Sequence, residues 1–174
     1  MHEYSVVKNA RRYFERLNSL LHNNNIIVEP KNCSSLLLIH VDGQRRILGW
    51  KIEREQVKFD DTSYLDCDEY AIKASQFYWI TSFSYHFQPS REEILFYRID
   101  LKDGQLHINP DPRCGLSQHL TGEGTLDVKD FNLYLALLVA LQYVGSYDKY
   151  PVDQGNREMY NRVIETGRRR LGSD

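Results

Sequence analysis

The chain has 174 residues, of which 41% are hydrophobic and 12% aromatic, and its 22 Lys and Arg side chains nearly balance 24 Asp and Glu. This composition excludes a disordered chain, and the length is typical of a single domain with a core of its own, here residues 1–174. The formal net charge of −2 excludes the global basic field that many nucleic-acid-binding proteins carry.

Basic residues are nevertheless concentrated near both ends of the chain, between Lys8 and Arg16 and between Arg162 and Arg170. They form solvated helix faces or, as the alternative, a nucleic-acid contact. The three cysteines contain no C-x-x-C pair, which favours free thiols in a reducing cytosol. The longest apolar run, Phe131–Val144, is too short to cross a bilayer. We therefore expect a cytoplasmic protein with no membrane partner and no cofactor.

The first half of the chain predicts one helix followed by strands. Apolar residues recur at helical spacing over residues 3–23, which indicates an amphipathic helix. Apolar runs predict a short strand at Ile26–Glu29 and a buried strand at Leu36–Val41, and alternation predicts another strand at Arg46–Phe59. Residues 64–74 fit either a strand or a short helical turn.

A long strand is predicted at Gln76–Phe87, followed by a hairpin whose turn is Asp103-Gly104. Asp-Gly suits a two-residue turn because a type I′ turn needs positive φ at both central positions. The resulting register places Asp100 opposite His107 and Arg98 opposite Asn109. The other face of this hairpin is apolar and consists of Tyr97, Ile99, Leu101, Leu106 and Ile108.

An earlier turn at Pro89–Glu92 carries the same register back to the long strand and places Phe83 and Tyr85 beside Arg98. One sheet face would then combine aromatic rings with an ion pair, an imidazole and an amide. Such rings stack RNA bases in single-strand-binding sheets. A core or a dimer interface is the alternative for the same aromatic stripe.

The chain ends in helices. Residues 110–125 contain too many Gly and Pro residues for regular structure. A helix that is apolar nearly all round follows from Val128 to Val144, and a last helix is predicted at Arg157–Leu171. The order of helix, strands and helices predicts an α+β fold, with a mainly antiparallel sheet covered on one face by the N-terminal helix and two C-terminal helices.

The polar face of the hairpin is the best candidate for chemistry. A carboxylate opposite an imidazole, as at Asp100 and His107, fixes the tautomer and suits acid–base catalysis. Arg98 would hold a phosphate through its planar guanidinium group. His119 and Arg113 in the following loop would supply a second proton-transfer group and a second cation. The alternative is a solvent-facing cross-strand salt bridge, which contributes little.

Two further groups of metal-ligating residue types match no site spacing and are interpreted as loop and surface residues, so no metal site is predicted. The first group is His107, Asp111, Cys114 and His119. The second group is Glu53, Glu55, Asp66, Asp68 and Glu69.

Several short motifs between residues 76 and 144 resemble a known family. They are Tyr85-His86, Phe96-Tyr97-Arg98-Ile99-Asp100, His107 and His119, followed by an amphipathic helix. This pattern resembles the TumE-type toxins of bacterial and archaeal toxin–antitoxin operons. The resemblance implies a toxin that a cognate antitoxin neutralises, and it carries over the positions Arg98, Asp100, His107 and His119.

The sequence is therefore interpreted as a toxin-type protein that acts on RNA as a metal-independent ribonuclease. His107 and His119 would be the acid and base, and Asp100 would orient His107. The expected substrate-binding residues are Arg98, Arg113, Asn109, Phe83 and Tyr85. The main alternative is a non-catalytic homodimeric or partner-binding module that uses the aromatic sheet face and the Phe131–Val144 helix. A small-molecule-binding protein is the third interpretation.

Overall fold

The computed structural model describes residues 5–89, 97–110, 120–121, 126–149 and 156–172. The strands are β1 (Val6–Val7), β2 (Ile27–Glu29), β3 (Leu38–Val41), β4 (Ile47–Phe59), β5 (Tyr64–Ala74), β6 (Phe77–Gln88), β7 (Tyr97–Lys102), β8 (Gln105–Pro110) and β9 (Leu120–Thr121). The helices are α1 (Ala10–Asn23), α2 (Leu133–Tyr143), α3 (Arg157–Gly172) and a short 3₁₀ turn at Cys33–Ser35.

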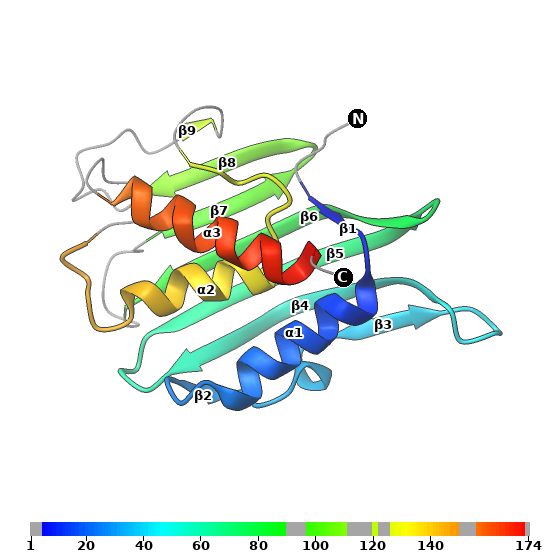
Figure 1. The fold of residues 1–174 in the computed structure, drawn as a ribbon, viewed down its shortest axis with the longest axis horizontal. Coiled ribbons are helices and arrows are strands. Elements are labelled where there is room, and N and C mark those ends of the chain that lie inside the picture. The colour runs from blue at the N-terminus through cyan, green and yellow to red at the C-terminus, as the bar shows by residue number, and fades with distance from the viewer. Residues whose placement is uncertain (1–4, 90–96, 111–119, 122–125, 150–155, 173–174) are drawn as a thin grey trace.

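The described strands form one antiparallel sheet in the order β2-β4-β5-β6-β7-β8-β9, with β1 added to β6 and β3 added to β4. Helices α1, α2 and α3 all lie in front of this sheet in Figure 1. Helix α2 packs on β5 and β6 and contacts both α1 and α3. The predicted α+β fold, with an antiparallel sheet covered on one face by three helices, is therefore confirmed. We call the opposite face, which none of these helices covers, the open face.

The N-terminal helix begins later than its apolar spacing predicts. Val6 and Val7 pair with Trp79 and Tyr78 of β6 and so form a short strand. The helix then begins at Ala10, because the Asn9 side chain accepts a hydrogen bond from the backbone N–H of Arg12 and caps the first turn.

The strand at Leu38–Val41 is exposed along its whole length, contrary to the buried strand that its composition predicts. It lies at the edge of the sheet, where it pairs only with β4 among the described strands. Leu36 and Leu37, directly before it, are the buried members of the run. An edge position leaves one side of a strand without neighbours, so hydrophobicity alone does not ensure burial.

Glu69 on β5 is a carboxylate in the centre of the core and is only 1% exposed. Its oxygens accept hydrogen bonds from Trp50 Nε1 at 2.6 Å, from the Tyr13 hydroxyl at 3.0 Å and from the Tyr85 hydroxyl. The backbone N–H of Leu133, at the N-terminus of α2, donates a fourth at 2.9 Å. One buried side chain therefore joins α1, β4, β6 and α2. The expectation that Glu69 lies on the surface is wrong.

Candidate functional site

The candidate site lies on the open face, across the adjacent strands β6, β7 and β8. Tyr97, Ile99 and Leu101 of β7 are buried under the helices, so the alternating residues Arg98 and Asp100 lie on the opposite side of the strand. The pairing of β7 with β8 places Asp100 opposite His107 and Arg98 opposite Asn109. This part of the predicted register is confirmed.

The pairing of β6 with β7 brings two further side chains to this group. His86 lies opposite Arg98, and Ser84 lies opposite Asp100. The sequence analysis did not include either residue among the candidates. The alternation of apolar and polar residues along β6 was the signal for both, because Phe83, Tyr85 and Phe87 are the apolar partners of the apolar residues of β7.

The expected position of Phe83 and Tyr85 is wrong. Phe83 pairs with Leu101 and Tyr85 pairs with Ile99, and the two rings are 3% and 0% exposed. They stack on each other at 4.8 Å between ring centroids inside the core. A base cannot stack on rings that are buried there, so the open face binds through polar groups.

The polar groups are centred on Asp100, whose side chain is 12% exposed. Its carboxylate forms an ion pair with Nε of Arg98, and its Oδ1 atom lies 3.9 Å from Nε2 of His86. Oδ1 is buried and has no hydrogen-bond partner within the described part of the chain. Burial of an unsatisfied carboxylate oxygen is costly, and the cost falls if a donor from a bound molecule reaches it.

His86 is partly exposed, at 26% of its side chain, and contacts both sides of this group. Its Nε2 atom lies 3.2 Å from Oγ of Ser84. The same nitrogen is the one nearer Asp100, so this is not a Ser-His-Asp relay, in which the two partners contact different ring nitrogens. Burial and the positive charge of Arg98 lower the pKa of His86, although Asp100 opposes that shift. At neutral pH the ring is therefore uncharged and can accept a proton.

The remaining predicted site residues divide between the open face and segments beyond the description. His107 and Asn109 are half-buried on β8 beside Asp100 and Arg98. His119 and Arg113 lie outside the described residues, and their roles stay predictions. Asp66 and Asp68 of β5 add negative charge next to His86, since they lie opposite His86 and Ser84. The site is therefore mixed in charge rather than basic.

Two negative results concern the described residues only. They contain no group of three or more His, Cys, Asp or Glu side chains arranged to hold a metal ion. None of the described helices combines the length and the apolar character needed to cross a membrane.

Comparison of the chain with models of protein families, with curated proteins and with solved structures gave no match. The resemblance to the TumE-type toxins therefore stays a prediction, and the functional argument depends on the open face itself.

Proposed function

We propose that the chain is a toxin-type ribonuclease of the cytoplasm that cleaves RNA by side-chain acid–base chemistry on the open face. The supporting observation is the position of His86 and His107 on the two strands that flank Arg98 and Asp100. Two imidazoles around one guanidinium group are the groups that cleavage of a phosphodiester by the neighbouring 2′-hydroxyl needs.

In the proposed reaction, uncharged His86 removes the proton from the 2′-hydroxyl. The 2′-oxygen forms a bond to phosphorus, and the bond from phosphorus to the 5′-oxygen breaks. His107 donates a proton to the leaving 5′-oxygen, and the products are a 2′,3′-cyclic phosphate and a 5′-hydroxyl. Arg98 would bind the phosphate oxygens through the part of its side chain that is exposed, about 40%. Asp100 acts as a positioning residue, because it contacts the two cationic groups rather than the reacting atoms.

Induction of the wild-type chain in bacterial cells is expected to arrest growth and to fragment total RNA. His107→Ala and Arg98→Ala variants are expected to remove both effects, because each deletes one group of the reaction. His40→Ala is the matched control, since His40 is exposed on β3 and remote from the site in the sheet order. Normal growth with well-folded wild type, or arrest by both site variants, would contradict the proposal. Rescue by a cognate antitoxin would support its toxin–antitoxin part.

A second function, a non-catalytic homodimeric module, is favoured by a different observation. The surfaces first expected for it are unsuitable, because the aromatic stripe and α2 are buried. However, β3 presents Leu38, Ile39 and Val41 at 58%, 45% and 51% exposure on a free sheet edge. Exposed apolar edges pair readily with a second strand.

Light scattering distinguishes this second function from the first. If two copies pair through β3, the wild type is expected to be a dimer, and Ile39→Lys is expected to be a monomer. The lysine places a charge where the second copy would pack. A monomeric wild type would remove this candidate, and a dimer that Ile39→Lys leaves intact would place the interface elsewhere.

A further inference from the structure

The basic residues of the two chain ends come together on the helix side of the protein. Lys8, Arg11 and Arg16 belong to the start and body of α1, whereas Arg168 and Arg170 lie in the last turns of α3. Helices α1 and α3 are in contact, and Figure 1 shows the C-terminal end of α3 beside α1. A chain with a net charge of −2 therefore carries a locally basic surface.

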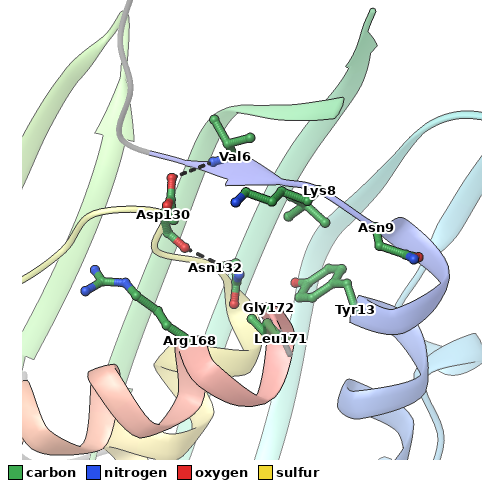
Figure 2. Close-up of a pocket in the computed structure, with 10 residues that line it drawn as sticks. Val6, Lys8, Asn9, Tyr13, Asp130, Asn132, Arg168, Leu171 and Gly172 are labelled. Atoms are coloured by element: carbon green, nitrogen blue, oxygen red, sulfur yellow. Dashed lines mark hydrogen bonds between the residues drawn. The ribbon is translucent and has the colours of Figure 1, made fainter. Parts of the chain in front are cut away.

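Three surface hollows follow this surface. The first, of about 200 Å³, has both Lys8 and Arg168 in its lining and is shown in Figure 2. The second, of about 290 Å³, is lined by Lys8, Arg11 and Arg46 at the N-terminus of α1. The third, of about 270 Å³, lies between Arg16 and Arg170. We call the three together the α1–α3 groove.

The lining of the groove is strongly asymmetric in charge. Its cations are Lys8, Arg11, Arg16, Arg46, Arg168 and Arg170, and its one acidic lining residue is Asp130. Two of the cations are paired with carboxylates outside the lining, Arg46 with Asp42 and Arg168 with Asp127.

The other arginines remain available. Arg11, Arg16 and Arg170 are exposed and have no carboxylate partner within the described residues. The third hollow adds only uncharged polar groups and a Leu and a Tyr to Arg16 and Arg170, its other lining residues being Ser19, Leu20, Asn23, Asn24 and Tyr134. Guanidinium groups with free donors, beside hydroxyl and amide groups, match the oxygens of a phosphate. The N-terminus of α1 adds partial positive charge at the second hollow.

We propose that the α1–α3 groove binds the phosphodiester backbone of a nucleic-acid strand. The groove has separate cationic hollows along α1, so its ligand must carry several anionic groups in a row rather than one. From Arg11 to Arg16 the helix rises about 7.5 Å, which separates their positions beyond a single phosphate group. The groove lies on the helix side and the catalytic candidate on the open face, so this binding does not depend on the proposed ribonuclease activity.

The test is the salt dependence of binding of a fluorescent 12-nucleotide RNA, measured by anisotropy. Replacing both Arg16 and Arg170 with alanine is expected to weaken binding at least about 10-fold at low salt. The slope of log K against log salt should flatten by about 1.4, because each lost phosphate contact on a single strand contributes about 0.7. The control is the double variant Lys58→Ala and Lys102→Ala, which changes the net charge equally on exposed sheet positions and should bind within about twofold of wild type.

Further arms separate this proposal from its competitors. His86→Ala is expected to bind RNA like the wild type, so loss of catalysis and loss of binding remain distinguishable. A DNA strand of the same length should compete equally, because the backbone carries the interaction. Equal loss of binding in both double variants, or equal competition by a polyglutamate peptide, would overturn the proposal. Absence of salt-dependent RNA binding by the wild type would overturn it as well.

Discussion

Replacing Glu69 with glutamine is expected to lower the free energy of unfolding by about 3 kcal/mol at pH 5. Trp50 Nε1 and the N–H of Leu133 can only donate hydrogen bonds, and both reach the carboxylate in the core. A glutamine presents an NH₂ group at one of the two oxygen positions, so at least one buried donor loses its acceptor. Urea denaturation should show a lower midpoint with an unchanged m-value.

Glu53→Gln is the control for this prediction. The Glu53 carboxylate is exposed on β4 and pairs with Lys51 at the surface, so its loss should change stability by no more than about 0.5 kcal/mol. Glu69→Ala should be more severe than Glu69→Gln, because it leaves four donors without an acceptor and opens a cavity. That loss approaches the whole stability of a typical domain, about 5–15 kcal/mol. If Glu69→Gln proved as stable as the wild type, the four hydrogen bonds would not hold the layers together.

The same side chain gives the stability a dependence on pH. Burial raises the pKa of Glu69 above its usual value, against the opposing effect of its hydrogen bonds. Between the unfolded and folded pKa values, the folded state therefore holds more protons than the unfolded state. Stability is greatest below the unfolded pKa and decreases as the pH rises through the folded pKa. The stability difference between wild type and Glu69→Gln should consequently narrow as the pH increases.

The sequence predicts the hairpin of β7 and β8 in full, because its register depends on a single local turn. Asp103 and Gly104 both have positive φ, at 51° and 72°, as a type I′ turn requires. The pairs Asp100–His107 and Arg98–Asn109 then follow without any information on the rest of the protein.

The register of β6 could not be obtained from the assumed turn. Strand β6 continues to Gln88 and β7 begins at Tyr97, so the connection is longer than Pro89–Glu92. The matching of apolar residues decides the register instead, because a shift by one residue would expose the rings of Phe83 and Tyr85. Hydrophobic alternation in two adjacent strands is thus a safer guide than the length of an irregular turn.

Glu69 and the α1–α3 groove mark what a single sequence does not reveal. Glu69 alternates in step with the buried residues Leu65, Cys67 and Ala71, which was a usable signal, but its four partners come from distant segments. The two basic clusters are evident in the sequence, whereas their meeting depends on how α1 and α3 pack. Long-range packing decides both features.

His86→Ala is expected to reduce kcat/KM for RNA cleavage by at least about 100-fold, because a general base contributes about 10²–10⁴ to the rate. A substrate with a 2′-deoxy or 2′-O-methyl group at the cleaved position should not react with any variant, since it has no 2′-hydroxyl to deprotonate. His40→Ala should retain wild-type activity. Cleavage of the 2′-O-methyl substrate would show that the attacking group is not the 2′-hydroxyl and would remove His86 from the proposed role.

The pH profile of the wild type tests the same residue without removing it. Since burial and Arg98 lower the pKa of His86, the rate should rise with pH through an inflection below the usual value of about 6.5. Arg98→Gln removes the second of these influences, so its inflection should move to higher pH while KM for RNA increases. A purely structural Arg98 would lower the rate without moving the inflection. An inflection above about 6.5 in the wild type would assign the base to another group, because a histidine held neutral by burial and a neighbouring cation cannot titrate there.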